Sequence, residues 1–70
     1  MAEPPGDWKP LLGRKVSVRY RLREDPEHPF SEAIGIVQSV DGKRIEIINR
    51  RGEIAAIDTA DVLAAKIFPA

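Results

Sequence analysis

The sequence predicts an all-β fold, a small five-stranded barrel with a single helical turn before the last strand. One observation is the alternation of apolar and polar side chains over residues 15–23 with a period of two. Another is the pair of tight-turn signals, Asp41-Gly42 and Arg51-Gly52, which separate short apolar runs. Because successive strand side chains point to opposite faces and short turns join antiparallel neighbours, these patterns indicate a meander.

Length and composition limit the chain to one small domain. Its 70 residues include no cysteine, so disulfides and thiolate metal sites are excluded. The apolar fraction of 43% is typical of a folded domain. Basic and acidic residues number 11 each, whereas dedicated nucleic-acid modules usually carry a basic excess. The charges are nevertheless segregated, because residues 9–23 have no acid and residues 24–32 have no Lys or Arg.

The N-terminal segment, residues 1–10, is rich in proline and predicts an irregular arm that precedes a barrel over residues 11–70. Trp8 is the one large apolar side chain in this arm. Either Trp8 folds back over an open end of the barrel, or it is an exposed anchor for a partner.

The first four strands follow from the residues in order. In a first strand over about 15–23, the side chains that point inward are those of Val16, Val18, Tyr20 and Leu22. The loop after this strand contains two prolines. A second strand is expected over 33–40, and its central Gly35 indicates a bulge or a close backbone approach. Asp41-Gly42 predicts a two-residue hairpin turn with positive φ, and strands over about 43–50 and 53–57 follow.

The C-terminal segment, residues 58–68, permits two interpretations. Asp58 could cap a helix of about ten residues, or one helical turn over 58–61 could precede a last strand over 62–68. The second interpretation is favoured, because so short a helix is marginal without packing. Five short strands, a long first loop and two tight hairpins then describe an SH3-like barrel, whose closure would remove exposed sheet edges.

These segments resemble the small SH3-like domain at the N-terminus of some actinobacterial GNAT-family acetyltransferases. The resemblance rests on residues 13–22, 33–35, 51–53 and 61–66, and it spans about residues 11–69. It implies a non-catalytic role beside an acetyltransferase domain, in a free-standing relative or a fragment of a longer protein. GNAT domains carry a Gln/Arg-x-x-Gly-x-Gly/Ala loop for acetyl-CoA, which this sequence lacks, so no catalytic residue is carried over and no enzyme activity is expected.

The main candidate chemistry is a basic row formed by Arg19, Arg21 and Arg23 on the outward face of the first strand. Their side chains would repeat every ~6.5–7 Å, a spacing at which they could bind phosphates. Alternatively, they pair with acids of neighbouring segments. The acids considered are Glu46, Glu53, Glu24 and Asp25. The candidate binding residues are the basic row together with Trp8 and Phe30.

Other polar clusters predict structure rather than chemistry. His28 lies among acids, but a single histidine in a proline-containing loop offers no regular ligand spacing, so neither a metal nor a cofactor is expected. Asp58 and Asp61 would lie on a surface turn, where a capping role is expected. Lys43, Arg44, Arg50 and Arg51 are expected at solvated hairpin ends.

Ile48 departs from the alternation of its strand, because it falls on the face opposite Ile45 and Ile47. If Ile48 is exposed, it could join Trp8 or Phe30 in an apolar contact site. Alternatively, a bulge returns it to the core.

Two functions follow from these observations. The first is an interaction module that docks onto an acetyltransferase domain or another protein through the 24–32 loop and the basic row. The second is a small RNA- or DNA-binding barrel that uses Arg19, Arg21 and Arg23, although Tyr20 faces inward and is a poor stacking platform. A regulatory barrel similar to FeoA has support only from size. No apolar run approaches the ~20 residues of a membrane span and no signal-peptide pattern occurs, so a cytoplasmic location is expected.

Overall fold

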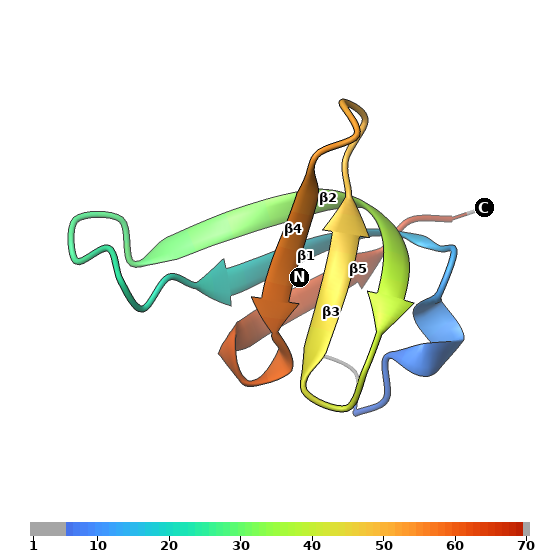
Figure 1. Cartoon of the computed structure of the whole chain (residues 1–70), viewed down its shortest axis with the longest axis horizontal. Helices are drawn as coiled ribbons and strands as arrows, with labels where there is room; N and C mark the ends of the chain where they lie inside the picture. Colours follow the sequence, from blue (N-terminus) through green and yellow to red (C-terminus); the bar gives the residue numbers. More distant parts are fainter. Residues whose placement is uncertain (1–5, 70) are drawn as a thin grey trace.

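A computed structural model describes residues 6–69, which form one antiparallel sheet of five strands (Figure 1). The strands are β1 (Lys15–Arg21), β2 (Phe30–Val40), β3 (Arg44–Ile48), β4 (Ile54–Asp58) and β5 (Val62–Ile67). Two 3-10 turns, η1 (Lys9–Leu11) and η2 (Thr59–Asp61), precede β1 and β5. The predicted all-β class, the five strands and the turn before the last strand are confirmed. Residues 1–5 of the predicted arm lie outside the described residues.

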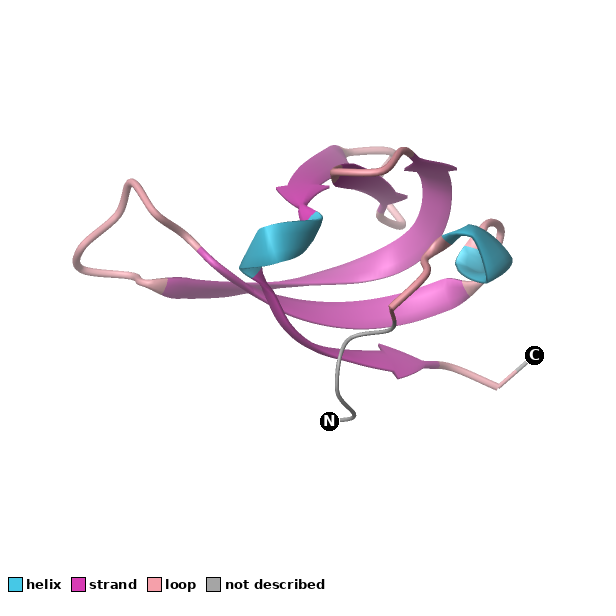
Figure 2. Ribbon diagram, turned by 90° about the horizontal axis from the view of Figure 1, so that it is seen from below, coloured by secondary structure: helices cyan, strands magenta, loops and turns pink. Residues whose placement is uncertain are grey.

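The sheet is strongly curved, and β2 runs through both of its halves (Figure 2). The first seven residues of β2, Phe30–Ile36, pair with β1, and Ile36–Val40 pair with β3 across an irregularity between Val37 and Ser39. The strand order is β4-β3-β2-β1-β5, so β4 and β5 are the two edge strands of the described sheet. Closure of the sheet was expected from the sequence, but β4 and β5 do not pair with each other in the described residues. Strand β2 begins three residues before its predicted start, and β1 ends at Arg21 rather than at 23.

The core lies on the concave side of the curved sheet and consists of small branched side chains. Val16 and Val18 of β1 are fully buried there, as the alternation predicts. Trp8 joins this core with 5% of its surface exposed, so it covers the core and is not an exposed anchor. The other buried core residues are Leu11, Val37, Ile45, Ile47, Ile57, Val62 and Ala65. Full burial stabilises a side chain of this size by about 1.5–3 kcal/mol.

Gly35 allows the two halves of the sheet to meet. A Cβ built at Gly35 would lie 2.1 Å from the backbone oxygen of Ile48 and 3.0 Å from the Cα of Asn49. Only a residue without a side chain fits this approach, so the close backbone contact predicted at Gly35 is confirmed.

The β2–β3 connection differs from the predicted turn. Among the described residues only Gly13 and Gly52 have positive φ, so Asp41-Gly42 is not the predicted positive-φ pair. Instead, the backbone N–H of Asp41 donates to the Arg44 carbonyl, and the Asp41 carboxylate accepts from the Lys43 N–H at 2.8 Å. This aspartate turn replaces the primed turn. The Lys43 N–H lowers the pKa of Asp41, because it stabilises the carboxylate.

The η2 turn fixes the corner between β4 and β5. The Asp58 carboxylate accepts from the Ala60 N–H at 3.0 Å, which confirms its capping role. The backbone N–H and the hydroxyl of Thr59 both donate to the Lys43 carbonyl, at 2.9 and 3.2 Å. These bonds tie the corner to the β2–β3 turn and set the direction in which β5 returns to β1.

Candidate interaction surface

A row of one lysine and three isoleucines crosses four strands on the outer face of the sheet. The register places Lys15 opposite Ile36, Ile36 opposite Ile48, and Ile48 opposite Ile54. Directly opposite residues of antiparallel strands project to the same face. Ile36 is 40% exposed and Ile54 is 53% exposed, while Ile48 is half-buried. The sheet therefore buries one apolar face in the core and leaves a second apolar surface in contact with solvent.

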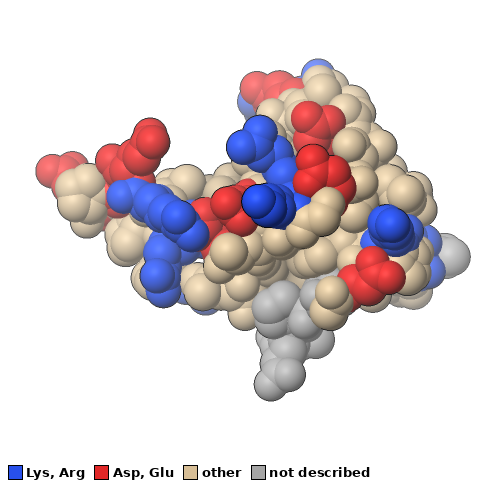
Figure 3. Space-filling model, turned by 60° about the horizontal axis from the view of Figure 1, so that its bottom comes forward, with Lys and Arg blue, Asp and Glu red and all other residues tan. Residues whose placement is uncertain are grey.

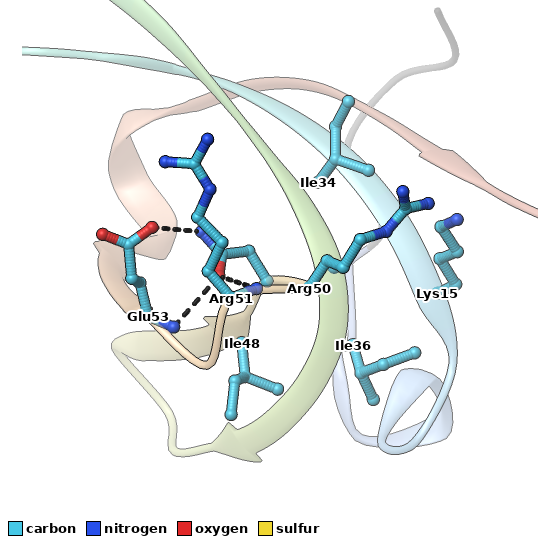
Figure 4. A pocket seen from close by; sticks show the side chains of 9 residues that line it. Lys15, Ile34, Ile36, Ile48, Arg50, Arg51 and Glu53 are labelled. Atoms are coloured by element: carbon cyan, nitrogen blue, oxygen red, sulfur yellow. Dashed lines mark hydrogen bonds between the residues drawn. The ribbon is translucent and has the colours of Figure 1, made fainter.

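Three residues of this row, Lys15, Ile36 and Ile48, line an outer groove of about 550 Å³ (Figure 4). Ile34, which lies two residues before Ile36 on the same strand face, extends its floor and is 46% exposed. The full lining is Lys15, Ile34, Gly35, Ile36, Ile48, Asn49, Arg50, Arg51 and Glu53. The volume lies within the range of natural ligand sites, and the floor is apolar, as in most such sites.

Asn49 organises the β3–β4 hairpin that forms one wall of the outer groove. Its side-chain oxygen accepts from the backbone N–H of Arg51 at 2.9 Å and of Glu53 at 3.0 Å, and its amide donates to the Glu53 carboxylate at 3.0 Å. Gly52 completes the turn with φ of 83°. Asn49 was not among the predicted site residues, although an asparagine at the start of a glycine-containing turn is the signal for such side-chain bonds.

The rim of the outer groove is basic. Within residues 6–69 the ion pairs are Arg23–Asp61 and the His28–Asp25 contact, so Lys15, Arg50 and Arg51 have no carboxylate partner in this range. In Figure 4 the Arg50 side chain extends between Ile34 and Lys15. The one acid of the lining, Glu53, accepts from Asn49. The groove therefore combines exposed isoleucines with positive charge that the described part of the chain does not neutralise.

The basic row separates into distinct contacts. The Arg19 guanidinium lies 5.6 Å from the centre of the Phe30 ring, a distance at which cation–π attraction operates. Arg23 donates from Nε to Asp61 at 2.6 Å. Arg21 is exposed. The face shown in Figure 3 has basic and acidic side chains beside one another rather than one basic field.

The acids proposed as partners of the basic row make other contacts. Glu46 accepts from Gln38 at 3.3 Å, and Glu53 accepts from Asn49. Across β1 and β2, the residue opposite Arg19 is Glu32. The interpretation of a paired surface therefore holds for Arg23, but its partner is Asp61, 38 positions away in the sequence.

The predicted binding residues do not form one site. Arg19 and Phe30 lie together, whereas Trp8 is in the core and is not available as a surface contact. Ile48 lies on the outer face, where its apolar neighbours are Ile36 and Ile54 rather than Trp8 or Phe30. Sequence reasoning missed the groove, because the run Ile34-Gly35-Ile36-Val37 is apolar on both faces and hides which side is exposed.

No group of three or more His, Asp or Glu side chains among residues 6–69 is placed to hold a metal ion. In the same part of the chain, no helix has the length and apolar character needed to cross a membrane.

Strand order and the η2 corner define a small all-β domain, and an exposed groove lies on its outer face. Residues 10–66 match the family model described as the Rv0428c N-terminal Sm-like domain, and the chain belongs to this family. The description names the fold Sm-like, where an SH3-like label was expected, and the five antiparallel strands are as predicted. Neither a curated protein nor a solved structure gives a significant match.

Proposed function

We propose that this chain is a non-catalytic interaction module that docks onto an acetyltransferase domain through the outer groove. The observation that carries the proposal is the apolar floor of Ile34, Ile36 and Ile48 beside cations that have no ion-pair partner among residues 6–69. Exposed apolar patches with a polar rim are typical of interaction sites. The sequence resemblance to domains that accompany GNAT acetyltransferases, and the N-terminal position in the family name, support this class of partner.

The composition of the groove favours binding over catalysis. Its lining contains no histidine, hydroxyl or thiol, and its single carboxylate is hydrogen-bonded to Asn49. General acid–base or nucleophilic catalysis requires such groups within reach of a bound substrate. The lining instead offers contact area and charge, which are the properties that position a partner.

A protein partner also fits the groove better than a nucleic acid does. Single-stranded nucleic acids bind through aromatic stacking platforms and basic tracks, and this lining contains no aromatic side chain. The alternative site for nucleic acid, Arg19, Arg21 and Arg23, has one member engaged by Asp61. The net charge of zero also disfavours nucleic acid.

The test is an amide chemical-shift titration of the ¹⁵N-labelled chain with a GNAT acetyltransferase domain from an actinobacterial protein that carries this type of N-terminal domain. Amides of residues 34–36 and 48–53 are expected to shift. Ile36→Asp should weaken binding at least tenfold, because it places a charge in the apolar floor. Leu63→Asp is the matched control, since Leu63 is similarly exposed, at 39%, and does not line the groove.

The same titration separates the two functions. The groove is not the docking surface if amide shifts are confined to Arg19 and Arg21. The same conclusion follows if Ile36→Asp and Leu63→Asp weaken binding of the acetyltransferase domain equally. A parallel titration with a poly(dT) oligonucleotide should give no shift at the groove, and a salt-sensitive shift at the basic row would support the nucleic-acid alternative instead.

A further inference from the structure

The outer groove presents its charges on the same side as its apolar floor. Lys15 enters from β1 and Arg50 from the β3–β4 hairpin, and in Figure 4 Arg50 points between Ile34 and Lys15. The Lys15 ammonium also lies 5.0 Å from the Phe68 ring, which extends the surface beyond β1. A ligand that covers the isoleucines therefore meets two cations at one edge of the floor.

The length of the row sets the size of its occupant. Lys15, Ile36 and Ile48, which line the groove, stand on three adjacent strands, which are separated by two inter-strand intervals. At about 4.8 Å per interval this part of the row is about 10 Å long. About three residues of extended chain cover that distance.

The chemistry of the rim selects carboxylates. Guanidinium groups bind carboxylates in paired hydrogen bonds, and such pairs are strongest where water is excluded, as beside an occupied apolar floor. The lining contains three cations, Lys15, Arg50 and Arg51, and one acid, Glu53, which is hydrogen-bonded to Asn49. A ligand that carries both carboxylates and apolar side chains can therefore contact the cations of the rim and the apolar floor at the same time.

We propose that the outer groove binds a short, extended acidic segment of the partner protein, in which aliphatic side chains are followed by carboxylates. The aliphatic side chains pack on Ile34, Ile36 and Ile48, and the carboxylates meet Lys15 and Arg50. This inference rests on the proposed docking function and adds the chemistry of the docked segment.

The experiment titrates the ¹⁵N-labelled chain with the peptide acetyl-Leu-Ser-Leu-Asp-Asp-amide, in which the two leucines and the last aspartate share one face of an extended chain. Its asparagine analogue, acetyl-Leu-Ser-Leu-Asn-Asn-amide, is the matched neutral probe. We expect amide shifts at residues 34–36 and 48–53, with the acidic peptide binding about fivefold more tightly than the neutral one at low salt. This advantage should shrink as salt is raised, because exposed charges are screened.

Two arginine variants locate the charge effect. Arg50→Gln should weaken binding of the acidic peptide about two- to fivefold and leave the neutral peptide unchanged. Arg21→Gln removes an exposed arginine outside the groove and should leave the affinity for both peptides unchanged. Ile36→Ser should weaken both peptides about fivefold, because it removes part of the shared floor.

Three results would overturn the inference. The first is equal affinity of the chain for the two peptides, and the second is weaker binding of the acidic peptide by Arg21→Gln but not by Arg50→Gln. The third comes from a parallel titration with phosphatidylglycerol vesicles, if these vesicles shift the groove amides and the acidic peptide does not. If the acidic peptide fails while the acetyltransferase domain still shifts the groove amides, only the acidic segment is rejected. If the peptide binds and that domain does not, the proposed partner is rejected and the ligand chemistry stands.

Discussion

The close approach at Gly35 gives the sharpest test of the fold, through Gly35→Ala. The added Cβ would lie 2.1 Å from the Ile48 oxygen, whereas ordinary contacts begin at 3.4 Å. The β2 and β3 backbones would therefore have to separate by about 1.3 Å. The obstructing atom belongs to the backbone and cannot rotate away, so we expect a cost near the upper end of the overpacking range, about 3 kcal/mol. The total stability of a domain of this size is only about 3.5–10 kcal/mol.

The assay is urea unfolding followed by the fluorescence of Trp8, which is the one tryptophan and is buried in the core. At a slope of about 1 kcal/mol per molar urea, the midpoint should fall by about 2–3 M. Gly42→Ala is the control, because a Cβ there meets nothing within 4 Å and φ is not positive. A Gly35→Ala midpoint equal to that of Gly42→Ala would refute the reasoning.

Three further predictions concern the turns and the ion pair. Asn49→Ala should lower the free energy of unfolding by about 1–2 kcal/mol and shift the Arg51 and Glu53 amides, because these two backbone N–H donors lose their acceptor; unchanged urea midpoints would contradict this. The pKa of Asp41 is lower in the folded than in the unfolded chain, so its contribution to stability is present above about pH 4 and is lost as pH falls through the folded value. Asp41→Asn should therefore flatten the acid limb of a stability–pH curve, and an unchanged limb would argue against it. Arg23→Ala should cost less than about 1 kcal/mol by urea unfolding, because this arginine is 62% exposed, and a larger loss would show that the pair with Asp61 is structural.

The sequence predicts best where one face is apolar and the other polar. Val16 and Val18 alternate with polar neighbours, and both are fully buried as expected. Gly35 interrupts an apolar strand, and the structure shows the close approach that explains it. Local patterns of this kind are readable because strand geometry repeats every two residues.

Prediction fails where distant segments decide the outcome. The partner of Arg23 is Asp61, which reaches it only because β5 returns to β1. The Asp41-Gly42 sequence suits a primed turn, yet the Asp41 carboxylate and the η2 corner, through Thr59, hold the loop in another geometry. The exposure of Ile34 and Ile36 likewise depends on which face the core occupies, and an apolar strand does not specify this.

Strand order also governs how this domain can form as the chain is synthesised. β1 lies between β2 and β5, and its pairing with β5 joins Val16 to Ile67. One side of β1 therefore has unpaired backbone groups until almost the whole domain has left the ribosome. An unpaired strand edge is a template for wrong partners, and contacts so distant in sequence form slowly. The nascent chain is consequently most exposed to misassembly just before residues 62–67 emerge, and a chaperone would be of most use in that interval.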